Sequence, residues 1–251
     1  MGNGADAPVL WDKASRKRKA AKIWAILQRV GPPGKFAALR CLDVGCGSGL
    51  IAQALAPHFR QVLGVEKDSR FMGSWRVLQG PKLQFLRGDA LHLPLADASV
   101  DIVICAQVYE HVDDAQVLVQ EIRRVLTPGG ICFFSGPNRL ALIEEHYKLP
   151  FVSWLPRSWA GAYLRLFGRA EHYAERPLTY WGLRRLWKGF QWRDFTWEMI
   201  RLPEEFFCVE ELRIAPWLKW LPGWLLRLLR PFYPNYNWLL VKPAEEEPCT
   251  R

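Results

Sequence analysis

The chain lacks any uncharged apolar run long enough to cross a bilayer, which takes about 20 residues. The apolar segment Ile23–Leu27 is also too short for a secretory leader and has no small-residue cleavage site after it. Met1-Gly2 begins like a myristoylation signal, but Asp6 occupies the position that requires serine or threonine. We therefore expect a cytoplasmic protein that is not integral to a membrane.

Cysteine pairs with metal-binding or redox spacing are also absent. The six cysteines include no C-x-x-C pair, and Cys105 and Cys132 lie in predicted strands. Isolated cysteines in a reducing compartment are typically small, buried apolar side chains. We therefore expect no metal centre in this protein.

Positive charge and tryptophan are abundant instead. The formal net charge is +9 over 251 residues, and most of the 13 tryptophans lie at or beyond Trp154. Excess cations favour an acidic partner, either nucleic acid or an anionic membrane surface. Tryptophan is favoured where one side of its ring is apolar and the other is wet. An apolar content of 50% is ample for the core of one large domain.

A strand, a glycine turn and a helix start follow one another near residue 45. Residues 40–44 predict a buried strand, and a helix is predicted from Leu50 to about Ala56, before Pro57. Three alternating glycines separate them: Gly45, Gly47 and Gly49. Glycines let a backbone turn tightly and approach a ligand closely, and a helix start offers unpaired N–H groups. The segment therefore predicts a ligand-binding corner.

Strand and helix patterns alternate over the next hundred residues. Further strands are predicted at 61–65, 83–86, 100–105 and 131–135, with a helix carrying Leu118, Ile122 and Val125 before the last. This alternation predicts a parallel sheet with helices on both faces. Such sheets bind ligands outside the carboxyl ends of their strands.

Polar residues stand at three of these strand ends. Glu66 ends the second strand, Asp89 and Ala90 follow the third, and Gln107 follows the fourth. Glu66 can accept hydrogen bonds from a ribose diol, and Asp89 can accept one from the amine of adenine. Alternatively, Glu66 is a solvated acid and Asp89 caps a turn. Asp43 has a supporting role, in which it orders the glycine turn.

The glycine turn resembles motif I of the class I S-adenosylmethionine (SAM)-dependent methyltransferases, in their type 11 branch. Leu50 stands where the dinucleotide fingerprint requires its third glycine. Glu110–Val112 and Arg124–Gly130 match the same family, and the resemblance covers residues 40–138. It implies that SAM is bound by Asp43, Gly45, Gly47, Gly49, Glu66, Asp89, Ala90 and Gln107.

With this resemblance, we expect a Rossmann-like, doubly wound α/β sheet of seven strands, mostly parallel with an antiparallel last strand. Residues 1–35 would be a tail and a basic helix, and 36–138 the SAM-binding core. Residues 139–188 would form a helical lid over the acceptor, within which Trp159, Tyr163, Leu166 and Phe167 line one helix face. Residues 189–243 would supply the last two strands, at 189–200 and 235–242, with an aromatic helix between them. Residues 244–251 would be a disordered tail, like residues 1–10.

Two amphipathic helices remain open to interpretation. The helix at 12–30 is either a solvated cover for the sheet or a basic helix on anionic lipid. The segment from Trp217 to Leu229 keeps helical spacing through Pro222-Gly223, and no acid occurs from Ala215 to Lys242. It is either an internal core helix or an in-plane membrane helix.

Methyl transfer needs a base only where the acceptor loses a proton, and the candidates are His111 and His146. The function predicted is SAM-dependent methyl transfer to a small, amphipathic or lipid-linked acceptor at the inner membrane face. An RNA methyltransferase is an alternative, although residues 106–109 lack the Asn/Asp-Pro-Pro-aromatic motif of amino-methylating enzymes. A non-catalytic SAM-binding interaction protein is another, and a dinucleotide oxidoreductase is a distant one.

Overall fold

The structure, a computed structural model, describes residues 13–31, 33–211 and 216–244. The disorder expected for residues 1–10 and for the acidic tail after Ala244 lies outside the described residues.

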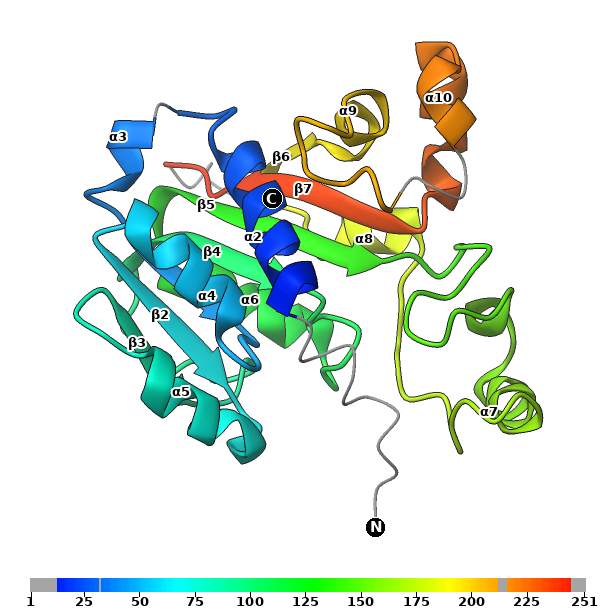
Figure 1. Ribbon diagram of the computed structural model, residues 1–251, viewed down its shortest axis with the longest axis horizontal. Coiled ribbons are helices and arrows are strands. Elements are labelled where there is room, and N and C mark those ends of the chain that lie inside the picture. The colour runs from blue at the N-terminus through cyan, green and yellow to red at the C-terminus, as the bar shows by residue number, and fades with distance from the viewer. Residues whose placement is uncertain (1–12, 32, 212–215, 245–251) are drawn as a thin grey trace, which may run out of the picture.

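A seven-stranded sheet forms the centre of the described part of the chain (Figure 1), in the order β3-β2-β1-β4-β5-β7-β6. The strands are β1 (Arg40–Val44), β2 (Gln61–Glu66), β3 (Leu83–Arg87), β4 (Val100–Ala106), β5 (Leu126–Pro137), β6 (Gln191–Asp194) and β7 (Asn235–Val241). Strands β1 to β5 pair in parallel, and β7 runs antiparallel to both β5 and β6. The expected doubly wound sheet with an antiparallel last strand is confirmed.

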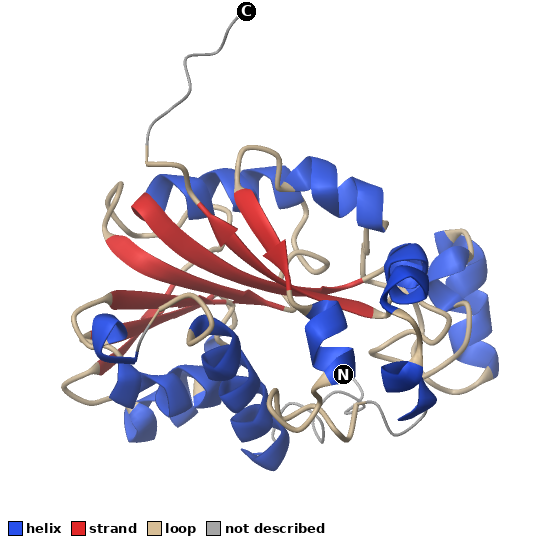
Figure 2. Cartoon of the chain, turned by 90° about the horizontal axis from the view of Figure 1, so that it is seen from above, coloured by secondary structure: helices blue, strands red, loops and turns tan. Residues whose placement is uncertain are grey.

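Helices cover both faces of this sheet (Figure 2). The first face packs against α2 (Lys13–Leu27), α4 (Leu50–Leu55) and α9 (Thr196–Arg201), and the second against α6 (Ala115–Val125) and α8 (Tyr180–Leu186). Successive strand residues alternate between the two cores, so that Ile104 faces the first and Cys105 the second. The remaining helices are α3 (Pro33–Phe36), α5 (Met72–Leu78), α7 (Arg157–Leu166) and α10 (Gly223–Leu229). Short 3₁₀ turns occur at Ala56–His58, Ser69–Phe71, Val152–Trp154, Pro216–Trp220 and Arg230–Phe232.

Side-chain caps fix where two of these helices begin. The carboxylate of Asp114 accepts hydrogen bonds from the N–H groups of Gln116 (2.8 Å) and Val117 (3.3 Å) at the start of α6. The hydroxyl of Thr179 accepts one from Gly182 (3.2 Å) at the start of α8.

The predicted strand at 189–200 is wrong in its second half, because β6 ends at Asp194 and α9 follows. The carboxylate of Asp194 accepts the N–H of Thr196 (2.9 Å), which turns the chain out of the sheet. Strand β5 is longer than predicted, because Leu126 pairs with Val100 ahead of a register shift.

Two helices expose apolar faces. In α7 the predicted aromatic face is largely exposed, and the helix packs instead through Ala160 and Leu164. The segment after Pro216 breaks at Pro222 as expected and restarts as α10. Its tryptophans do not enter the core: Trp217, Trp220 and Trp224 are 58%, 79% and 68% exposed. The interpretation as an internal core helix is therefore wrong for the tryptophans, although Leu226 is buried. Among the described residues, no helix is both long and apolar enough to span a bilayer.

Candidate active site

The glycine turn after β1 requires glycine for steric reasons at two positions. A Cβ on Gly45 would lie 2.8 Å from a methyl group of Val108, and one on Gly49 would lie 2.5 Å from the ring of Phe85. Both residues have positive φ angles, +64° and +81°. The N–H of Gly45 donates to the carbonyl of Val65 (2.8 Å), which ties the turn to the end of β2. Gly47, at φ +51°, has the more open surroundings, with Phe71 at 3.9 Å from the position of a Cβ.

The carboxylate of Glu66 lies against this turn. One oxygen accepts the N–H of Gly47 (3.1 Å), and the other accepts those of Lys67 (2.8 Å) and Asp68 (2.9 Å). Three backbone donors thus hold the side chain in one orientation while leaving it half-buried. Glu66 is therefore hydrogen-bonded to the glycine turn and is not an isolated solvated acid.

Asp89 lies beyond the end of β3, next to Glu66 along the sheet edge. Its carboxylate accepts the N–H of Leu91 (3.0 Å) and binds the ammonium of Lys67 (2.6 Å). The Lys67 ammonium and the Leu91 N–H hold the pKa of Asp89 below its ordinary value. Ala90 lies in the turn that the N–H of His92 closes on the carbonyl of Asp89 (3.0 Å). Asp89 therefore caps this turn, which is one of the two roles considered for it.

Gln107 follows β4 on the opposite side of the glycine turn. It has a positive φ of +61°, which is uncommon for a residue with a side chain, and its N–H donates to the carbonyl of Ser135 (2.8 Å). Strained backbone of this kind is concentrated at functional sites.

Asp43 is buried beneath the glycine turn. Burial raises its pKa to about 7, although the charge of Arg16 and the N–H of Ala52 oppose the shift. One of its oxygens has no hydrogen-bond partner among the described residues. The hydrogen bonds to the glycine turn that were expected of Asp43 do not occur among those found for the described residues.

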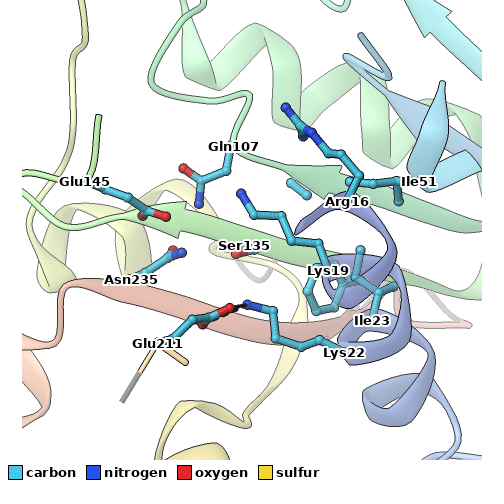
Figure 3. Close-up of a pocket in the computed structure, with 12 residues that line it drawn as sticks. Arg16, Lys19, Lys22, Ile23, Ile51, Gln107, Ser135, Glu145, Glu211 and Asn235 are labelled. Carbon is cyan, nitrogen blue, oxygen red and sulfur yellow. Dashed lines mark hydrogen bonds and ion pairs between the residues drawn. The ribbon is translucent and has the colours of Figure 1, made fainter. Parts of the chain in front are cut away.

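A small cavity of about 30 Å³ adjoins Gln107 (Figure 3). Lys19 extends from α2 toward Gln107 and Glu145, while Ser135 and Asn235 line the side formed by the sheet. Oxygen atoms of Glu145 and Asn235 have no hydrogen-bond partner among the described residues. The cavity therefore offers both cations and free acceptors to a bound molecule.

The two histidines named from the sequence lie close together beside Glu110. Their ring centroids are 5.2 Å apart, and each Nε2 points toward one oxygen of Glu110, at 3.8 Å for His111 and 3.9 Å for His146. Burial raises the pKa of Glu110 to about 8. Burial lowers the pKa of His146, but Glu144 and Glu110 outweigh it and raise the value to about 9.

Three basic residues of α2 line the site but were not predicted as site residues. The helix was expected to turn its basic half to solvent or lipid, yet Arg16, Lys19 and Lys22 line the cavity. Lys22 is buried and pairs with Glu211 (2.9 Å). A signal was present, because Lys19 and Lys22 continue the apolar stripe of Ile23 and Ile26 at helical spacing.

The strand order brings the predicted SAM-binding residues to one edge of the sheet. The spatial order β3-β2-β1-β4 sets Asp89, Glu66, the glycine turn and Gln107 side by side. Neighbouring strands are about 4.8 Å apart, so this row is about as long as a nucleoside joined to an amino acid.

Comparisons with known proteins agree with this geometry. Residues 42–134 match a family model described as a methyltransferase domain, of the type 11 branch. The chain is 33% identical to a ubiquinone biosynthesis O-methyltransferase of Leptothrix cholodnii, over 57% of this chain and 66% of that one. It is 31% identical to the human thiol S-methyltransferase TMT1B, over 58% of each chain.

A solved structure of an S-adenosylmethionine-dependent methyltransferase from Mesorhizobium loti shares the fold, with a TM-score of 0.56 and 17% identity. The alignment covers 88% of this chain and 97% of that one. The matches to relatives from Mycolicibacterium smegmatis, Mycobacterium tuberculosis and Mycobacteroides abscessus span only 38% to 41% of those proteins. With the fold and the family match taken together, residues 42–134 are a class I SAM-dependent methyltransferase domain.

Proposed function

We propose that the protein transfers a methyl group from SAM to a small-molecule acceptor. The observation that carries this proposal is the row of Asp89, Glu66, the glycine turn and Gln107 along one edge of the sheet. SAM, when bound, supplies a methyl group that is already activated. The protein must then align the two reactants and exclude water.

The residues present fit this cofactor. We assign the ribose diol to Glu66, whose carboxylate is already oriented by three N–H donors. We assign the adenine amine to Asp89 beside Ala90, and the amino-acid end to the open backbone at Gly47 and Gln107. Asp43, Gly45 and Gly49 would support the turn from behind, where the spaces beside both glycines are filled by side chains.

The acceptor would bind next to the small cavity beyond Gln107, with residues 139–188 acting as a lid. The relatives named as O- and S-methyltransferases support an acceptor whose oxygen or sulfur loses a proton. His146 and His111 would face that atom, because both lie beside Glu110, three residues after Gln107.

We further propose that the acceptor is amphipathic or lipid-linked and is met at an anionic membrane surface. The exposed tryptophans around α10 support this, together with Lys219 and Arg227, since aromatic rings and cations favour a lipid interface. Lys19 and Arg16 in the cavity wall would favour an anionic acceptor.

The test uses SAM with an isotope-labelled methyl group and separate membrane and soluble extracts. Mass spectrometry should detect a labelled small molecule, enriched in the membrane extract, with the wild-type chain but not with Glu66→Gln. Label found only in RNA would overturn the acceptor class. No label, with SAM still bound, would favour a non-catalytic binding protein.

Membrane binding is tested by sedimentation with vesicles of equal parts phosphatidylglycerol and phosphatidylcholine. Replacing Trp217, Trp220 and Trp224 by serine should weaken binding about tenfold or more, because their exposed rings would no longer enter the lipid. A matched control is Val77→Ser, which removes an 84% exposed apolar side chain on α5, at the other end of the molecule (Figure 1). Equal binding by the triple variant and the control would refute the membrane surface.

A further inference from the structure

Glu110 is a fully buried carboxylate that the fold does not account for. It is 0% exposed, and neither of its oxygens has a hydrogen-bond partner among the described residues. Burying an ionised carboxylate without a partner costs several kcal/mol, so such groups are normally paired or coordinate a metal. A cation bound beside Glu110 would allow this buried carboxyl group to ionise in place.

Two imidazoles point at this carboxylate from different parts of the chain. His111 comes from the loop after β4, and His146 comes from the segment between β5 and α7. Their Nε2 atoms lie 3.8 and 3.9 Å from the same Glu110 oxygen, and one ligand atom from each of the three residues lies within 4.8 Å of the others. These distances are too long for direct hydrogen bonds.

The same distances are close to those around a small metal ion. Ligands bound at about 2.0 to 2.2 Å in tetrahedral geometry lie roughly 3.4 Å apart. A movement of about half an ångström would close each Glu110–histidine pair, and a movement of up to about 1.4 Å would close the widest pair of the three. The side chains of His111 and His146 are 45% and 26% exposed, which leaves room for that movement.

Glu144 orients His146 in the way that carboxylates orient metal-binding histidines. Nδ1 of His146 lies 2.8 Å from one oxygen of Glu144, while the other oxygen accepts the N–H groups of His146 and Tyr147, each at 2.7 Å. Since a carboxylate only accepts, Nδ1 carries a hydrogen and Nε2 is directed toward Glu110. Such carboxylate–histidine–metal arrangements fix the tautomer and the ring orientation of a ligand.

We propose that Glu110, His111 and His146 bind a divalent transition-metal ion, with zinc the best fit to two imidazoles and one carboxylate. Three protein ligands with an open fourth position are typical of catalytic rather than structural zinc. This site departs from the expectation of no metal, which considered cysteine spacing alone.

The open position would lie near the cavity, because Glu145, next to His146, lines it. An acceptor oxygen or sulfur bound there would release its proton to solvent water more readily, since both histidines would be ligands. This role rests on the proposed function, whereas metal binding itself does not. As a ligand, His146 would hold the metal through Nε2 and could not also accept the acceptor's proton there.

The test titrates the full-length, chelator-treated chain with Zn²⁺ by calorimetry and with Co²⁺ by visible absorption. We expect one ion per chain and a tetrahedral or five-coordinate cobalt spectrum. Glu110→Gln and His146→Asn should each weaken Zn²⁺ binding at least about tenfold, and Glu144→Gln by about 10- to 100-fold. His172→Asn, at an exposed histidine, is the matched control.

Binding that survives in the Glu110→Gln, His146→Asn double variant would overturn the proposal, as would no Zn²⁺ binding to the folded wild type. Circular dichroism checks the fold, which Glu110→Gln should preserve because it removes a buried charge. SAM titrations run in parallel: Glu66→Gln should lose SAM but keep zinc. Failure of the metal site and failure of the SAM site are therefore distinguishable.

Discussion

Replacing Glu66 by glutamine tests the ribose assignment most directly. The variant keeps the length of the side chain but replaces one carboxylate oxygen by an NH₂ group, which cannot accept. That group would face either the N–H of Gly47 or those of Lys67 and Asp68, which the carboxylate now accepts at 2.8 to 3.1 Å. Loss of this acceptor oxygen therefore weakens both the hydrogen bonds that a carboxylate would accept from a ribose diol and those that hold the glycine turn.

The magnitude follows from the type of bond. A hydrogen bond to a charged group contributes about 1.5 to 3 kcal/mol, so losing one of them should weaken SAM binding about 10- to 200-fold. Titration calorimetry with SAM and with S-adenosylhomocysteine measures this, and thermal unfolding confirms that the variant is folded. The control is Glu204→Gln, at an exposed carboxylate. A folded Glu66→Gln chain that binds SAM within threefold of the wild type would refute the assignment.

Three further predictions concern stability, each measured by urea unfolding. Gly49→Ala should destabilise by about 2 to 4 kcal/mol, because its methyl group meets Phe85 at a positive φ, and no loss would contradict the packing of the turn. Asn138→Ala should cost about 2 to 4 kcal/mol, since its amide donates to the buried carbonyls of Pro231 (2.7 Å) and Tyr233 (2.8 Å); a loss below about 1 kcal/mol would contradict this. Burial raises the pKa of Asp43 to about 7, so the folded state binds its proton more tightly than the unfolded state. Stability should therefore fall between about pH 4 and pH 7, by up to about 4 kcal/mol, and Asp43→Asn should flatten that slope; parallel pH profiles would contradict it.

The parts of the fold set by short-range patterns could be predicted. Strands β1 to β4 carry runs of apolar residues that alternate between two cores, so periodicity located them within a residue or two. Because these strands are parallel, their carboxyl ends share one edge of the sheet. The sequence alone therefore predicts that Glu66, Asp89 and Gln107 lie at this edge.

Features set by long-range contacts could not be predicted. The chain leaves β6 because Asp194 captures the N–H of Thr196, and Thr196 in turn accepts the N–H of Asn237 from β7 (3.0 Å). The Asp194–Thr196 bond is local, but the contact with Asn237 depends on the position of β7, which lies outside residues 189–200. The burial of Glu110 between His111 and His146 likewise depends on where residues 139–179 fold back.

The two halves of the candidate site therefore differ in how they are held. The half assigned to SAM is built from strand ends and turns, with hydrogen bonds that join residues of β1, β2 and β3. The acceptor half is assembled from α2, the segment after β5 and the start of β7, which meet only through the tertiary fold. Because Lys19 and Glu145 line the cavity and are not among the residues assigned to SAM, substitutions at either should change which acceptor is used while leaving SAM affinity nearly constant. The residues assigned to SAM lie in short, recognisable sequence segments, whereas the acceptor side is formed only when distant segments fold together. This explains why the sequence indicated the methyl donor and not the acceptor.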